Sequence, residues 1–363
     1  VQFTVSIILI IGTVIVYRQV QFAKGRQVGY TREGLISIGM NTPELFGHYD
    51  ALRSDLIQTG AVDNMAESNS TVTEIWSNNS GVEWEGKDPN SDPLFGTIAV
   101  TQDFGKTVGW KITEGRDFSR DFNDTSAFIL NESAVKIMGL KNPIGKKMKW
   151  ANKEHIVTGV IKDMVMESPF KPAVPSIFHM SPDWVNLITV KIKSGVPLRD
   201  ALAKIETVFK KYNPGSPFEY KFIDEEYAQK FSDEERIGNL ATFFAVLAIF
   251  ISCLGLFGLA SFVAEQRTKE IGIRKVVGAS VFNLWQMLSK DFVVLVIISC
   301  LIAVPIAYYF MHGWLQNYDY RTEISWWIFA AVSIGALMIT LLTVSFQAIR
   351  AALANPVKSL RTE

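Results

Sequence analysis

Four long runs without a charged residue or histidine constrain the fold of this chain more than any other feature. They are Val1–Tyr17, Leu240–Ala264, Phe292–Met311 and Ile324–Ile349. A charge at the centre of a membrane helix costs about 2.5–3.5 kcal/mol, and a membrane-spanning helix needs about 20 apolar residues. Three of the runs meet that length, and the core of a soluble protein rarely holds three such helices. The pattern therefore predicts four membrane-spanning helices.

The first run is the shortest of the four. Its helix would span roughly 26 Å at 1.5 Å per residue, slightly less than the hydrocarbon core of a bilayer. Because the sequence starts with Val1 and not with methionine, we expect this helix to be truncated and the chain to be part of a longer one. A signal peptide is the alternative interpretation. It is disfavoured because no basic segment precedes the run and no small-x-small cleavage site lies before Arg18.

The basic residues of the short connecting segments predict the orientation in the membrane, since lysine and arginine collect on the cytoplasmic side. The segment after the second run and the tail after the fourth are rich in them, whereas the loop between the third and fourth runs has only Arg321. The basic residues are Arg267, Lys269, Arg274, Lys275, Lys290, Arg350, Lys358 and Arg361. We therefore expect the second loop and the C-terminus inside the cell and the long segment after the first helix outside. Arg18, Lys24 and Arg26 oppose this orientation, but long domains translocate largely regardless of charge.

The outer segment, Gly29–Asn239, is long enough for one substantial domain or two small lobes. Short β-rich runs bounded by turn residues alternate there with two stretches of helical spacing, which predicts an α+β domain. A stretch rich in Asn, Ser, Gly and Trp, Ser68–Pro93, is expected to form a long surface loop or small lobe. The expected strands are Leu35–Ile38, Thr97–Val100, Ala127–Leu130, Ile156–Ile161, Ser176–His179 and Leu187–Ile192, and the expected helices are Pro43–Gln58 and Pro197–Tyr212.

The charge balance and the cysteines argue against several classes of function. Lysine plus arginine equals aspartate plus glutamate at 36 each, so the chain has no overall basic field and we expect no nucleic-acid partner. Cys253 and Cys300 both lie inside apolar runs. We expect both to behave as small buried hydrophobic residues. Their positions argue against a disulfide framework and against a metal site.

No motif for catalysis, for a cofactor or for a metal is visible. The segment Gly139–Lys147 superficially resembles a phosphate-binding loop. However, five residues separate its glycines, no Ser or Thr follows the lysine, and Pro143 favours a turn. The histidines His48, His155, His179 and His312 are scattered without metal-ligand spacing, so we expect them to be solvated or hydrogen-bonded. We predict that the chain is not an enzyme and that it binds no cofactor.

The most informative stretch is Glu265–Ser280, where the second membrane helix is expected to enter the cytoplasm. Charged residues alternate there with Ile271, Ile273, Val276 and Val277, as in a short amphipathic helix lying on the membrane or in a groove. Gly272 and Gly278 permit close approach or a turn. Ser280 can cap a following helix that carries Phe282, Trp285 and Leu288. A simple positive-inside loop with an interfacial helix explains the pattern equally well.

Residues Arg267–Ser280 closely resemble the signature of FtsX-like permease domains, which occur in MacB-type ABC transporters and lipoprotein-release permeases. The segments Glu114–Ser119, Leu130–Val135, Asn142–Lys146 and Val157–Asp163 are similar to recurring pieces of the MacB-like periplasmic core. The resemblance covers nearly the whole chain in family order. The opening residues Gln2–Ile7 are similar to larger duplicated permeases in which such a unit occurs twice, so this chain would be the second half.

The resemblance implies an order of domains: a truncated helix at 1–17, a periplasmic core with its stalk at 18–239, and an FtsX-like permease domain at 240–363. Helices at 240–264, 292–311 and 324–349 would flank a cytoplasmic coupling segment at 265–290. The stalk would be Asp224–Asn239, with Tyr227 and Phe231 on one side and acidic residues in solvent. Those acidic residues are Asp233, Glu234 and Glu235. Pro305 is expected either to kink the third helix or to be simply tolerated there.

The resemblance also implies a mechanical function. In this family a cytoplasmic P-loop ATPase subunit dimerises on ATP and pushes on the coupling segment, and the motion reaches a periplasmic domain that handles the substrate. The other expected partners are a second permease copy or half, the lipid bilayer, and a periplasmic or outer-membrane protein. Two alternatives stay open: an FtsX-like regulator of a cell-wall hydrolase, and a membrane-anchored sensor without an ATPase. The residues expected to couple to the ATPase are Glu265, Arg267, Lys269, Glu270, Ile271, Gly272, Arg274, Lys275 and Gly278.

Overall fold

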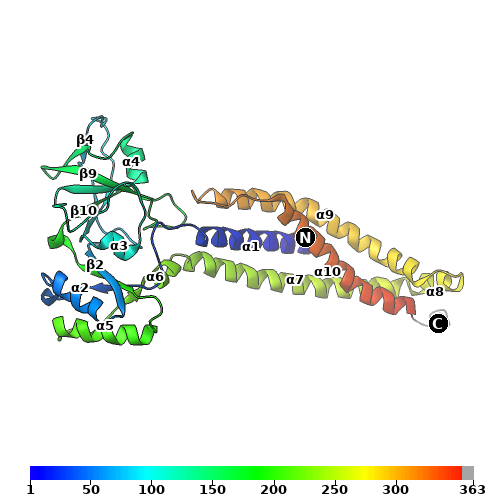
Figure 1. Ribbon diagram of the computed structural model, residues 1–363. Coiled ribbons are helices and arrows are strands. Elements are labelled where there is room, and N and C mark those ends of the chain that lie inside the picture. The colour runs from blue at the N-terminus through cyan, green and yellow to red at the C-terminus, as the bar shows by residue number, and fades with distance from the viewer. Residues whose placement is uncertain (354–363) are drawn as a thin grey trace. The chain divides into compact units, whose positions relative to one another are not determined.

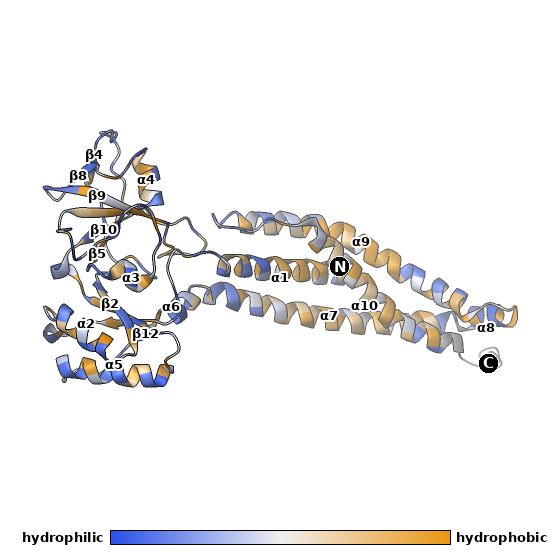
Figure 2. Cartoon of the chain, viewed as in Figure 1, coloured by the Kyte–Doolittle hydropathy of each residue, from blue (hydrophilic) through white to orange (hydrophobic). Residues whose placement is uncertain are grey.

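In the part of the chain that the structure describes, four helices are long and apolar enough to cross a membrane. Figure 1 shows their course, and Figure 2 shows the hydrophobic residues along them. The four helices are α1 (Gln2–Lys24), α7 (Ser232–Gln266), α9 (Val281–Leu315) and α10 (Trp326–Leu353). Each contains most or all of one predicted run, so the prediction of four membrane helices is confirmed. The computed structural model describes residues 1–353, and the predicted inner tail residues Lys358 and Arg361 lie outside this range.

The described chain divides into two compact units. One holds the four long helices together with the short helix α8 (Thr268–Val276), and the other is Gly25–Phe231. The α+β fold predicted for the outer segment is confirmed in the second unit, where helices accompany a 12-stranded sheet.

Helix α1 supplies the apolar centre of the helical unit. Its buried residues Ile7, Ile11 and Ile15 pack against small residues of α9 and against α10. Near its start, the Ser6 hydroxyl lies 3.0 Å from that of Ser252 on α7. Near its other end, the fully buried side chain of Gln19 bonds to the α9–α10 loop. The N-terminal helix is therefore an integral part of the bundle.

The two cysteines and the proline considered in the sequence analysis lie within the long helices. Cys253 and Cys300 are free thiols, half-buried in α7 and α9, so they are less buried than predicted. Pro305 lies inside the continuous helix α9.

The sheet of the second unit runs in the order β12-β1-β11-β2-β5-β10-β7-β9-β8-β4, with β3 paired to β5 and β6 to β9. All six predicted strands are present. The strands are β1 (Leu35–Gly39), β2 (Val62–Ser68), β3 (Asn78–Asn79), β4 (Glu83–Trp84), β5 (Phe95–Val100), β6 (Ile112–Gly115), β7 (Ala127–Asn131), β8 (Lys147–Trp150), β9 (Lys153–Ile161), β10 (Ser176–Met180), β11 (Leu187–Ile192) and β12 (Lys221–Phe222).

The sheet is divided into two lobes where β2 meets β5, because Ser68 and Val100 form the only residue pair of that ladder among the described residues. The α2–α5 lobe consists of β12, β1, β11 and β2 with α2 (Tyr49–Gln58) and α5 (Leu198–Tyr212). The α4 lobe consists of β5, β10, β7, β9, β8 and β4 with α4 (Glu132–Met138). Each lobe has its own hydrophobic cluster. The helices α3 (Phe104–Val108) and α6 (Ile223–Gln229) complete the unit.

Two predictions about local structure were wrong in part. The single helix expected over Pro43–Gln58 is interrupted, because Gly47 adopts a positive φ of 78° between a short 3₁₀ turn, Pro43–Leu45, and α2. The segment expected as a surface loop from Ser68 begins instead in the interior. Asn69 is buried there and accepts a hydrogen bond from the backbone of Ala99 through its side chain, at 3.0 Å. Hydrogen bonding within the sheet explains why these polar residues are buried.

The segment Asp224–Asn239 contains most of α6 and the first turns of α7. Tyr227 and Phe231 are both buried, as predicted for one side of the segment. Asp233 and Glu235 are exposed, but Glu234 is half-buried and so differs from the prediction. The role of this segment as a stalk stays a prediction.

Candidate functional site

The connection between α7 and α9 folds into a helical turn whose ends are set by specific residues. Helix α8 ends in a Schellman motif: the Gly278 N–H donates to the Lys275 carbonyl at 3.2 Å, and the Ala279 N–H donates to the Arg274 carbonyl at 2.9 Å. Gly278 has a φ of 97°, which glycine adopts without steric cost. The Ser280 hydroxyl then accepts a bond from the Asn283 N–H at 3.2 Å and caps α9. The predicted turn and cap are thus confirmed.

One side of α8 is fixed against the long helices. Ile271 is buried and packs with Leu284 and Leu288 of α9 and Ala348 of α10. Beside this cluster, the Trp285 indole N–H donates to the Ser345 hydroxyl at 2.7 Å and joins α9 to α10. A displacement of α8 would therefore act directly on two long helices.

The other side of α8 presents apolar side chains to the surroundings. Ile273, Val276 and Val277 are 56%, 68% and 82% exposed, and Phe282 at the start of α9 is 65% exposed. The predicted single apolar face is therefore split: Ile271 is buried, and these four side chains form an outward-facing apolar tip. Such a patch, rimmed by charged residues, is typical of a surface for a partner protein or a membrane.

Two ion pairs brace the charged residues of this segment. Glu270 and Arg274 lie one turn apart on α8 with a separation of 2.7 Å, and Arg267 lies 3.3 Å from Asp291 of α9. Arg274 also contacts the sulfur of Met287. Because the side chains of both pairs are more than a third exposed, each pair contributes about 0.5 kcal/mol. Neither pair therefore adds much to the stability of the turn.

The predicted coupling residues therefore differ in how far their side chains are exposed. Glu265 and Lys269 are exposed, Lys275 is half-buried, and Gly272 is buried beside Ile271. Sequence reasoning missed Asp291 and Ser345. The signal for Asp291 was available, since it is the first acid after α8 and borders an apolar run. Nothing in the sequence singles out Ser345 within its run.

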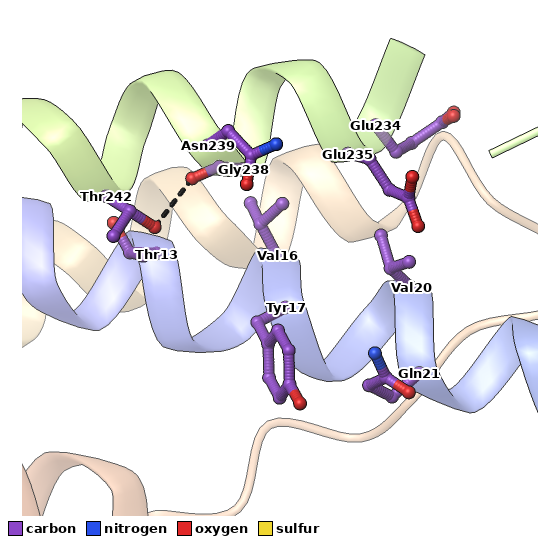
Figure 3. A pocket seen from close by; sticks show the side chains of 10 residues that line it. All are labelled: Thr13, Val16, Tyr17, Val20, Gln21, Glu234, Glu235, Gly238, Asn239 and Thr242. Carbon is purple, nitrogen blue, oxygen red and sulfur yellow. Dashed lines mark hydrogen bonds between the residues drawn. The ribbon is translucent and has the colours of Figure 1, made fainter. Parts of the chain in front are cut away.

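A second candidate is a hollow of about 310 Å³ between α1 and α7, shown in Figure 3. Val16 of α1 and Gly238 of α7 approach closely there, and Glu235 forms an ion pair with Lys24. The remaining lining residues are apolar or carry hydroxyl and amide groups, apart from Glu234. This lining holds no nucleophile paired with a base, so it does not have the composition of a reaction site.

The histidines of the outer domain do not form a metal site. His155 and His179 are buried on either side of Phe128, with ring centroids 4.0 and 6.5 Å from it. Burial lowers the pKa of both, to about 4 for His179. The expectation that the histidines are solvated or hydrogen-bonded is confirmed for His312, whose ring lies 3.1 Å from the Gln316 amide, whereas Nδ1 of His155 and Nε2 of His179 have no partner among the described residues. Within residues 1–353 no cluster of three metal-ligand side chains occurs.

The loop that resembled a phosphate site is a turn, as predicted. The Lys146 N–H donates to the Pro143 carbonyl at 3.1 Å, and the Lys146 ammonium pairs with Glu85 at 2.9 Å. Its lysine is therefore engaged by a carboxylate of the same domain.

Comparison with known families matches nearly the whole chain. Residues 2–208 match the MacB-like periplasmic core domain, and residues 242–356 match the FtsX-like permease C-terminal domain. The chain is 24% identical over 231 residues to the macrolide export ATP-binding/permease protein MacB of Chromobacterium violaceum, covering 60% of this chain and 36% of that protein. It is 27% identical over 317 residues to MacB of Aggregatibacter actinomycetemcomitans, covering 81% of this chain and 47% of that protein.

The chain thus spans half or less of the length of these relatives. Among solved structures, the periplasmic region of MacB from Actinobacillus actinomycetemcomitans aligns at 17% identity with a TM-score of 0.39. That alignment covers 53% of this chain and 91% of the other.

Proposed function

Since this chain belongs to the MacB/FtsX type of ABC transporter permeases, we propose that it transmits ATP-driven motion across the membrane for the export or extraction of a substrate. It is an inner-membrane protein with a periplasmic domain. In this proposal the segment 265–290 receives the motion in the cytoplasm, and the long helices carry it to the domain outside. ATP hydrolysis takes place on a separate P-loop ATPase subunit, and a second permease copy or half completes the assembly.

The observation that carries the proposal is the two-sided construction of α8. Ile271 anchors one side to α9 and α10, while Ile273 and Val277 on the other side are exposed. A partner that buries exposed apolar side chains gains about 25 cal/mol per Å² of apolar area. A push on the outer side is passed to α9 and α10 through the packed inner side. This arrangement supports a receiving surface for an ATPase.

The first experiment replaces the exposed apolar tip with the Ile273→Ser/Val277→Ser double variant. We expect insertion to stay normal, and we expect both co-purification of the cognate ATPase and its stimulation in proteoliposomes to be reduced at least tenfold. The matched control is Leu94→Ser, which changes a 60% exposed side chain of the outer domain. Undiminished ATPase binding by the double variant would contradict the proposed coupling surface.

The second experiment removes the ion pair with the Glu270→Ala/Arg274→Ala double variant. The pair itself stabilises the helix by only about 0.5 kcal/mol, so a large loss of coupled ATPase activity has to come from the partner interface. Normal coupled ATPase activity in this variant would contradict the coupling role and would indicate that the segment 265–290 only fixes the orientation of the helices in the membrane.

The orientation is tested with cysteine labelling from the two sides of the membrane. We expect a cysteine at Asn79 to react from outside and one at Gly278 to react only after permeabilisation. Labelling of both positions from the same side would refute the arrangement with four spans.

A further inference from the structure

Trp76 lines three adjoining hollows on the surface of the outer domain. Two of them, of about 480 and 620 Å³, share the lining residues Thr71, Tyr220 and Glu226. The third, of about 360 Å³, is lined by Trp76 together with Trp184. Because Trp76 borders all three, they are taken together as one surface, here called the aromatic groove. Its defining residues are Trp76, Trp184, Tyr220, Thr71, Glu226 and Asn186.

The exposure of the two tryptophans sets this groove apart from the rest of the domain. Trp110 is only 8% exposed, and Trp84 and Trp150 are half-buried against the core of the α4 lobe. Trp76 and Trp184 are 48% and 59% exposed. A tryptophan in contact with water leaves a large apolar ring unburied. The two most exposed tryptophans of the domain thus border the same hollow, which is the pattern of a binding surface.

The side chains of Trp76 and Tyr220 are oriented by contacts within the domain. The Trp76 indole N–H donates to the Glu74 carboxylate at 3.1 Å, and the Trp76 backbone N–H donates to the Ser70 hydroxyl at 3.1 Å. Tyr220 lies between Phe218 and Phe222, with ring centroids 5.2 and 5.4 Å away. Rigid rings lose little conformational entropy when a ligand binds.

The polar groups of the groove are suited to hydroxyl-rich ligands. The Thr71 and Thr73 hydroxyls donate to one oxygen of Glu226, at 3.3 and 3.0 Å, and so orient its carboxylate. The amides of Asn41 and Asn186 border the neighbouring hollows. Carboxylates accept and amides both donate and accept hydrogen bonds, which matches the hydroxyl groups around a sugar ring.

We propose that the aromatic groove binds an extended glycan chain. A sugar ring has an apolar C–H face that stacks on an aromatic ring and a polar rim that hydrogen-bonds to carboxylates and amides. A docked polypeptide would instead need desolvated apolar pockets for its anchoring side chains. The hollows of this groove are instead lined by charged side chains beside the aromatic rings, among them Glu219, Lys221 and Glu226. The proposal does not depend on the coupling role of α8.

The test measures binding of the tetrasaccharide of β-1,4-linked N-acetylglucosamine to the full chain by calorimetry. The protein is purified in an amine-oxide detergent, because the sugar headgroups of maltoside detergents would compete. We expect saturable binding that weakens at least tenfold in the Trp76→Ala/Trp184→Ala variant. The control Phe122→Ala changes a 57% exposed aromatic residue outside the groove and should bind normally. Unchanged circular dichroism and thermal unfolding establish that the variants are folded.

Three results would overturn the proposal: no saturable binding of the tetrasaccharide, equal binding by the double variant, or equal loss in the Phe122 control. A parallel titration uses reduced, carboxymethylated α-lactalbumin as an unfolded polypeptide. Tryptophan-dependent binding of that polypeptide in place of the tetrasaccharide would identify a polypeptide site and equally refute a glycan site. The coupling experiments use substitutions in α8, whereas this test uses substitutions in the outer domain. Failure of the glycan proposal can therefore be distinguished from failure of the coupling proposal.

Discussion

The buried carboxyl group of Glu67 should make the outer domain less stable as the pH rises. Glu67 lies on β2 with 4% exposure, and its Oε1 atom has no hydrogen-bond partner among the described residues. Burial, and secondarily the charge of Asp50, raises its pKa from an ordinary value of 4.5 to about 7. The folded domain therefore holds a proton that the unfolded chain releases between these two values.

The magnitude follows from proton linkage. Each tenfold difference in proton affinity is worth about 1.36 kcal/mol, so this group changes the unfolding free energy by roughly 3 kcal/mol. Its pKa is raised on folding, so the stability is fully present below pH 4.5 and is lost as the pH rises through about 7. The Glu67→Gln substitution keeps a neutral side chain of the same shape at every pH. The variant should match the wild type near pH 4.5 and be more stable by roughly 3 kcal/mol at pH 8.

The assay is urea unfolding of the segment 25–231, followed by circular dichroism at a series of pH values. The other carboxylates titrate in both proteins and cancel in the difference between them. Glu114→Gln, at an exposed position on β6, is the matched control and should show no pH-dependent difference. A constant difference between the Glu67 variant and wild type from pH 4.5 to 8 would refute the reasoning.

The remaining predictions concern two buried polar side chains. Gln19→Leu removes the bonds to the Tyr320 carbonyl and the Thr322 N–H, at 2.9 and 2.8 Å. It should cost about 1–3 kcal/mol and speed hydrogen exchange in the α9–α10 loop, whereas unchanged exchange would show that other contacts hold the loop. Asp124→Ala removes a 2% exposed side chain that binds Arg116 at 2.6 and 2.8 Å. It should lower the unfolding free energy of the domain by about 2 kcal/mol, and a change below about 0.5 kcal/mol would contradict this.

The sequence was most informative where one physical effect dominates. Uncharged runs located all four long helices because lipid tolerates few charges. Residues flanking those runs extended the helices: α7 begins at Ser232, eight residues before the predicted run. Hydropathy does not detect such extensions, since a helix that leaves the membrane continues with polar residues.

Weak or non-local signals accounted for most of the failures. Strand β2 was missed because its residues Asn64 and Glu67 are polar, although both are buried by neighbouring strands. At the coupling segment, the turn and cap at Gly278 and Ser280 were readable because they are local. By contrast, the burial of Ile271 and the exposure of Val277 could not be predicted from the sequence, because they depend on how α8 packs against α9 and α10.

The strand order of the outer domain has a consequence for its synthesis. The α4 lobe is one continuous piece of chain from β4 to β10, whereas in the α2–α5 lobe β11 lies between β1 and β2. Strands β1 and β2 therefore have no central partner until about 120 further residues have been made. At 5–20 residues per second this takes roughly 6–24 s. Throughout that interval both strands have open edges, and the α4 lobe is itself complete only at Met180, the end of β10. The α2–α5 lobe is therefore the last part of the nascent domain to close and the part that most needs chaperone protection.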